Sequence, residues 1–401
     1  MKLINARSPY VIEVNEATSD GSKLEVFLWN PGSTEPPAVW LPSTAYVVND
    51  KVSYNDNYYN CTIAGTSGTT PPTHTTGAAA NGTATFTFTG NAVTTNTKVY
   101  TLSKNNPSTT QKSTQYNISN LTRDYINNVF TSGANSFAVE LVGNWAWVRV
   151  KRYNLIGVAY TLLDNTLYGA ENGYSGFMSG LNTAYTVTTI PLVLGSSSIT
   201  YKVKDNATNY VNIFAPAGTW NYTNVTTGDN TNIVATDFTL FRFPIKNGEN
   251  KFTDVGSATL YFTIVGVTEN EAKYTPVVCR FLNRYGGWDF ITFYKAKTFS
   301  TNTTSNNYKV LPSALNYNPL LGQNKLFNIN GQLSVKLNTG WIDEECNVQI
   351  QDLLLSEFVY LDNVPVVLKT KGTDIKTSLQ NKNINYEMEF DYAFNSINDQ
   401  V

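Results

Sequence analysis

Short runs of alternating apolar and polar residues dominate the beginning of the chain. Residues 10–14 and 23–29 are alternating or apolar runs, and turn-forming Asn, Gly and Pro residues bound them. The tripeptide Asn-Pro-Gly at 30–32 interrupts the pattern. A run of the same kind resumes at 98–103. These patterns predict β-strands.

The residues between these runs differ from both flanks. Residues 36–94 begin with Pro-Pro, include the low-complexity stretch TSGTTPPTHTTGAAANGT at 66–83, and end in a Thr-alternating run. Surface loops tolerate insertions because few contacts cross them. The change in composition therefore predicts a small module inserted between two strands of one domain.

Further along, the pattern predicts two helices and one hairpin. Residues 119–130 carry apolar residues four apart, and Ser119 could cap that helix. The runs 137–142 and 145–151 flank Gly143-Asn144, which predicts a β-hairpin, and residues 153–181 read as loop with short strands. Residues 343–358 are the second predicted helix, with acidic residues in its first turn.

From residue 182 onward, strand-like runs recur at short spacing. They are followed at 384–390 by a strictly alternating run that places Ile384, Tyr386, Met388 and Phe390 on one face. The predicted fold class is all-β: a multi-domain β-sandwich or barrel protein with one or two short helices. The predicted domains are an N-terminal β-sandwich (1–35 with 95–181), the inserted β module (36–94), a middle β domain (182–272) and a C-terminal β domain with one helix (273–401).

Composition narrows the possible functions. The chain has 401 residues, of which only 14% are charged, and a formal net charge of −2. No basic stripe is present, so we expect no direct nucleic-acid binding. No apolar run is long enough to span a membrane, the N-terminus lacks the features of a signal peptide, and no membrane partner is expected.

Candidate chemistry is sparse. The chain has one histidine, His74, in a Thr/Pro/Gly loop, and three widely spaced cysteines that form no disulfide or zinc pattern. The acidic cluster at 343–345 fits a helix N-terminus better than a calcium site. Gly286-Gly287 before Trp288 reads as a hairpin turn with the tryptophan packed on the core. We therefore predict no enzymatic activity, no metal and no cofactor.

The inserted module concentrates aromatic residues. Trp40, Tyr46, Tyr54, Tyr58 and Tyr59 lie within twenty residues of one another, together with Asp50 and Val52. This order resembles the small carbohydrate-binding modules of chitinases, which are often embedded in phage tail proteins. The resemblance implies that these five aromatics contact a sugar.

Three alternatives stay open for the five aromatics. They could form the core of a very small domain, contact a glycan, or dock onto another protein. Asn49 replaces the glycine usual in the resembled modules. Phe86 and Phe88 stand where a second tryptophan often lies. These departures weaken the implied sugar binding.

The C-terminal part carries a second resemblance. The order NRYGGWD (283–289), TGWIDEE (339–345), LLLS (353–356) and YEMEFDYA (386–393) resembles virion proteins of tailed phages of Bacteroidetes-type hosts, in tail, ring, baseplate or distal-tail-like components. It implies a structural tail protein, located in the virion after synthesis in the bacterial cytoplasm. The implied partners are copies of itself in a six- or twelve-fold ring and other tail or portal-proximal proteins. The alternative is a glycan-binding adhesin or receptor-binding tail protein that contacts a host surface glycan.

Overall fold

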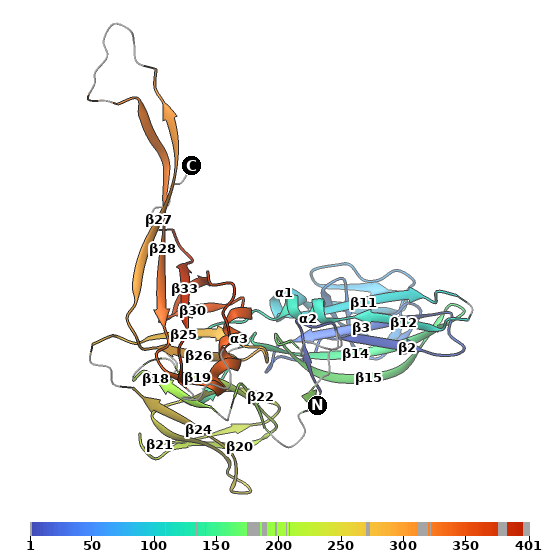
Figure 1. Cartoon of the computed structure of the whole chain (residues 1–401). Coiled ribbons are helices and arrows are strands. Elements are labelled where there is room, and N and C mark those ends of the chain that lie inside the picture. The colour runs from blue at the N-terminus through green and yellow to red at the C-terminus, as the bar shows by residue number, and fades with distance from the viewer. Residues whose placement is uncertain are drawn as a thin grey trace.

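The fold was analysed in a computed structural model that describes residues 2–108, 110–132, 135–140, 142–174, 185–186, 191–196, 199–205, 207, 209–269, 273–311, 320, 322–375 and 383–395. The predicted all-β class is confirmed, because 56% of the chain is strand and 7% is helical. Figure 1 shows the N-terminal sheets at one side, the middle sheets below, and the C-terminal sheet with a long projecting hairpin above.

The N-terminal part is built on a six-stranded sheet. Its order is β11 (Thr97–Asn105), β3 (Gly21–Trp29), β14 (Trp145–Ile156), β15 (Ala159–Glu171), β1 (Lys2–Asn5) and β16 (Tyr185–Thr186). A two-stranded antiparallel sheet, β2 (Val11–Asn15) with β12 (Ser113–Asn117), and helix α2 (Ser119–Tyr125) lie beside it. All nine residues of β3 are buried, because one face packs on aliphatic residues and the other on tryptophans.

Two local predictions for this part are wrong. The runs around Gly143-Asn144 do not pair with each other: β13 (Ala138–Val139) pairs with β22, and β14 pairs with β3 and β15. The region expected to be loop instead contains the 13-residue strand β15. Tertiary pairing decided both outcomes, and turn chemistry alone could not reveal it.

Helix α2 is shorter than predicted and capped differently. It ends at Tyr125, and Ser119 is its first residue, not its cap. The side chain of Asn117 instead accepts hydrogen bonds from the Ser119 backbone N–H (3.1 Å) and hydroxyl (2.8 Å).

The inserted segment forms its own sheet. Its order is β4 (Ala38–Val39), β6 (Lys51–Tyr54), β7 (Asn57–Ile63), β10 (Ala84–Asn91) and β9 (Ala78–Asn81), with β5 (Ala45–Tyr46) and β8 (Gly65–Thr66) as a small pair and α1 (Ala92–Thr95) at its end. The flanking strands β3 and β11 pair antiparallel, so that Trp29 lies opposite Thr97. The segment thus leaves and re-enters the N-terminal sheet at one point.

The middle part is two sheets packed face to face. One is β13, β22 (Thr239–Pro244), β19 (Tyr210–Ala215) and β17 (Leu192–Leu194); the other is β18 (Thr200–Val203), β24 (Thr259–Thr268), β23 (Gly248–Asp254), β20 (Gly218–Asn224) and β21 (Asp229–Ala235). Their inward aromatic and aliphatic side chains form one core. Aromatic contacts join this part to both neighbours: Phe214 packs with Trp145 in a second cluster, and Phe290 of the C-terminal part packs with Tyr201 within the core itself.

The C-terminal part is a seven-stranded sheet covered by a helix. The order is β26 (Trp288–Phe293), β25 (Val277–Leu282), β30 (Val359–Leu361), β31 (Val364–Leu368), β33 (Glu387–Tyr392), β28 (Asn324–Asn338) and β27 (Thr298–Lys309). Strand β29 (Ile342–Asp343) forms a small pair with β32 (Asn383–Ile384). It is followed in the chain by the 3-10 turn η2 (Glu344–Cys346) and helix α3 (Asn347–Leu355). The helix predicted at 343–358 is therefore present over 344–355, and all four alternating residues at 384–390 are buried against it.

The β27–β28 hairpin extends beyond the sheet that anchors it. Strand β33 pairs with β28 only over Ser334–Asn338, whereas β27 pairs with β28 along nearly its whole length. The rest is a two-stranded ribbon, and all twelve residues of β27 are exposed. In Figure 1 this ribbon projects away from the body of the molecule.

Candidate functional site

The five predicted sugar-contacting aromatics divide between the core of the module and its surface. Trp40 and Tyr59 are buried in a cluster with Val52, Cys61 and Phe86, while Tyr46 is half-buried at its edge. Tyr58 is also buried, and its hydroxyl forms a hydrogen bond with Thr97 in the N-terminal sheet. Tyr54 is the most exposed of the five, at 37%.

This burial separates structural from surface roles. The ring of Tyr54 meets Trp40 edge-on at 6.4 Å, so Trp40 supports it from below. The Tyr46 oxygen accepts a hydrogen bond from the Leu41 N–H (2.8 Å), which holds the edge of the module. Sugar stacking needs an exposed ring face, so glycan contact stays a prediction that centres on Tyr54 among the five.

Other motif residues of the module serve its fold. The Asp50 carboxylate accepts a hydrogen bond from the Val47 N–H at 2.8 Å and closes a turn. The ring of His74 lies 4.9 Å from that of Tyr59, and its Nε2 is 3.1 Å from the Phe86 carbonyl oxygen. His74 is thus half-buried and packed, where the sequence indicated a solvated loop position.

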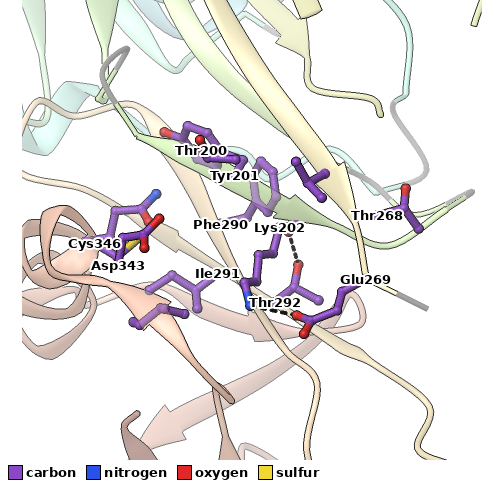
Figure 2. Close-up of a pocket in the computed structure, with 13 residues that line it drawn as sticks. Thr200, Tyr201, Lys202, Thr268, Glu269, Phe290, Ile291, Thr292, Asp343 and Cys346 are labelled. Atoms are coloured by element: carbon purple, nitrogen blue, oxygen red, sulfur yellow. Dashed lines mark hydrogen bonds and ion pairs between the residues drawn. The ribbon is translucent and has the colours of Figure 1, made fainter. Parts of the chain in front are cut away.

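The structure reveals a second candidate site, a cavity of about 320 Å³ between the middle and C-terminal parts (Figure 2). Strands β18 and β24 form one wall, β26 forms another, and β29 with the first turns of η2 and α3 forms the third. Strands β18 and β26 are each the outermost strand of their sheet, and β18 is only four residues long. The cavity therefore lies where two sheet edges meet.

The cavity is apolar inside and charged at its mouth. Its apolar lining comes from Tyr201, Val267, Phe290, Ile291 and Ile342. Figure 2 shows Thr268 and Glu269 on one side and Asp343 with Cys346 on the other.

Lys202 ties the walls of the cavity together. Its ammonium group donates to the Glu269 carboxylate at 2.7 Å, and its backbone carbonyl accepts from the Thr292 hydroxyl at 2.7 Å. The same ammonium also donates to the carbonyl of Trp341. An ion pair and two further hydrogen bonds thus join four segments that are far apart in the sequence.

The titratable groups near the cavity are not arranged for nucleophilic chemistry. Burial raises the pKa of the Cys346 thiol to about 11, so it is protonated at neutral pH. No histidine lines the cavity. Among the described residues, no group of three or more His, Cys, Asp or Glu side chains is placed to hold a metal ion.

Behind the cavity lies the NRYGGWD segment. Gly286 has a φ of +80°, and a Cβ on Gly287 would come within 2.7 Å of the Leu194 Cβ, so the turn requires both glycines. Trp288 is buried, as the sequence predicted, and its backbone N–H donates to the side-chain oxygen of Asn212 at 2.7 Å.

Asp289 is fully buried beside this turn. Burial raises its pKa to about 6. Its carboxylate accepts hydrogen bonds from the Phe290 N–H (2.7 Å) and the Gln349 amide (3.1 Å). Asp289 therefore links the segment to helix α3, which is a structural role.

Sequence reasoning missed the cavity. Lys202, Glu269 and Thr292 lie on different strands, and no spacing along the chain connects them. The nearest signal was the acidic run at 343–345, which marks the helix start at one side of the mouth.

Comparisons with known protein families, with characterised proteins and with solved structures find no match. Among the described residues, no helix has the length and apolar character needed to cross a membrane.

Proposed function

We propose that this chain is a structural component of a tailed-phage virion tail, a ring, connector or baseplate protein that assembles into a symmetric homo-oligomer. The observation that carries the proposal is the β27–β28 ribbon, which projects from the body of the molecule and whose strand β27 has twelve consecutive exposed residues. An unpaired strand edge is a template for association, and a monomer gains no buried surface from it. The resemblance of the NRYGGWD and TGWIDEE segments to tail components supports the same function.

Purified protein would be measured by mass photometry and imaged by negative-stain microscopy. A closed ring of six or twelve copies is the expected result, since heterologous contacts that close generate rings. A monomer or a compact trimer would contradict the ring and favour the receptor-binding alternative.

The alternative function is glycan binding by the inserted module. Tyr54 favours it, because this ring is partly exposed and is supported edge-on by Trp40. A glycan array would compare the full chain, the chain lacking residues 36–94, and a Tyr54→Ala variant. Binding that disappears in both altered proteins would support the alternative, whereas binding by none of the three would remove it.

A further inference from the structure

The ribbon and the cavity are complementary surfaces at opposite edges of one molecule. Strand β27 is at one end of the seven-stranded C-terminal sheet and β26, which lines the cavity, is at the other. Six strand spacings of about 4.8 Å separate these edges by about 29 Å. Figure 1 shows the ribbon pointing away from the cavity side. The ribbon therefore cannot reach the cavity of its own chain, but it can reach that of another copy.

The ribbon carries exposed apolar residues towards its distal end. Leu311 is 88% exposed and Leu326 is 59% exposed. Tyr308 and Phe327 form an aromatic pair on one face, with ring centroids 5.6 Å apart, and both are partly exposed. Exposed apolar groups clustered on a projecting element are typical of an interaction surface.

The cavity offers a matching receptor. Its interior is lined by aromatic and aliphatic side chains, and its volume of about 320 Å³ is enough for a large apolar side chain. Trp341, adjacent to the lining residue Ile342, is 57% exposed beside the mouth. Tryptophan is among the residues that most often dominate interface energetics.

The charges of the ribbon and of the residues around the cavity are opposite in sign. Residues 298–338, from the start of β27 to the end of β28, contain three of the chain's 28 Lys and Arg residues and none of its 30 Asp and Glu residues. The remaining residues therefore have 25 basic and 30 acidic side chains, a formal charge of −5. Within the ribbon, Lys309 and Lys325 accompany the distal apolar residues. Asp343, which lines the cavity, is exposed, and so is Glu345, two residues further along the chain.

The contact area is also sufficient. Residues 301–309 of β27 lie beyond the part of β28 that pairs with β33. At about 3.3 Å per residue this free strand is about 30 Å long, and a two-stranded ribbon is about 10 Å wide. One face then covers about 300 Å², and the free edge adds a similar area because side chains extend about 5 Å on each side. The total of about 600 Å² per partner is at the lower end of the range for a specific interface.

We infer that the β27–β28 ribbon of one copy docks on a second copy of this chain, with its distal apolar residues against the cavity between β18, β26 and η2 and its lysines facing the acidic mouth. The contact is heterologous, because the two surfaces differ and lie on opposite edges, and repetition of it builds a ring or a filament. This inference rests on the proposed oligomeric function and specifies the interface.

A charge-swap series on the full chain tests the docking. The ribbon variant is Lys309→Glu with Lys325→Glu, the mouth variant is Asp343→Lys with Glu345→Lys, and the swap variant carries all four changes. Val158→Ser is the control, since Val158 is 97% exposed and lies outside both surfaces. Mass photometry and sedimentation at several concentrations give the midpoint of association, and thermal melting checks that each variant is folded.

Like charges across an interface are strongly unfavourable, so each two-residue variant should raise the midpoint concentration by about tenfold or more. The swap variant should return it to near the wild-type value, and the control should not change it. The wild-type association should also weaken in high salt, because exposed charges are screened.

Two results would overturn the inference. The interface would be excluded if the wild-type chain forms an oligomer that neither two-residue variant weakens, or if the swap variant fails to recover the association that the two-residue variants lose. Either result would leave the proposed tail function in place. A wild-type chain that stays monomeric at every concentration would contradict both the interface and the oligomeric function.

Discussion

Trp288 is the largest of the fully buried side chains. Its ring contacts those of Phe130 and Tyr360 at centroid distances of 5.2 and 5.8 Å, so it joins three separate segments of the chain. We expect Trp288→Ala to lower the free energy of unfolding by about 3–5 kcal/mol, because it leaves a cavity in a packed core.

Denaturant unfolding followed by circular dichroism would measure this change. Phe394→Ala is the matched control, since Phe394 is 71% exposed, lies in neither the ribbon nor the cavity lining, and an exposed substitution usually changes stability by less than about 0.5 kcal/mol. Equal effects of the two substitutions would contradict the burial of Trp288.

Asp289 gives the stability of the protein a pH dependence of unusual sign. Its pKa is about 6 when folded and near 3.8 when unfolded, so the folded chain holds this proton more tightly. The contribution of Asp289 to the free energy of unfolding should therefore be greatest below pH 4, and it should decrease as the pH rises to about 6. A difference of about two pKa units corresponds to about 3 kcal/mol.

Asp289→Asn removes this titration and keeps a side-chain oxygen that can accept from the Phe290 N–H. We expect the variant to gain stability relative to wild type between pH 4 and pH 7, measured by denaturant unfolding at several pH values. The comparison cancels the contribution of Glu171, whose pKa burial also raises. Parallel profiles for the two proteins would contradict the prediction.

At the scale of elements, the alternating runs were the most informative sequence signal. The run at 384–390 placed four side chains on one buried face, and the structure confirms this. Strands β3 and β11 were also expected, and they pair with each other. The sequence did not predict which strands pair with each other. Strands β13 and β14 flank a good turn sequence but lie in different sheets, because pairing with distant strands buries more surface than a local hairpin.

The module between β3 and β11 provides a test at this scale. Residues 36–94 would be deleted and the flanks joined by a short Gly/Ser linker. Trp29 and Thr97 remain opposite each other in one ladder, so we expect soluble, folded protein. The deletion removes contacts with the N-terminal sheet that include the Lys98–Asp56 ion pair, the hydrogen bond between Tyr58 and Thr97, and the packing of Val39 on the tryptophan cluster.

Thermal unfolding and the oligomeric state would be measured on the shortened chain. Insoluble protein, or a cooperative transition lost from the rest of the molecule, would show that the module is an integral part of the fold.

For the whole molecule, the fold class was predictable and the candidate sites only in part. The module aromatics could be found because they lie within twenty residues of one another. The burial of these aromatics could not be predicted, because the packing of the five-stranded sheet decides which strand positions face inward and which face outward. The cavity depends on four strands and a helix brought together from residues 200 to 349, which no sequence spacing encodes.

The pairing of Trp29 with Thr97 has a consequence for how such chains diversify. Opposite residues of an antiparallel ladder lie about 5 Å apart, so the N-terminal sheet presents two neighbouring attachment points. Any folded unit whose own ends lie this close could replace the module without altering the strand register. The position is thus an insertion site at which related chains could acquire or exchange surface-exposed units while the rest of the molecule stays the same.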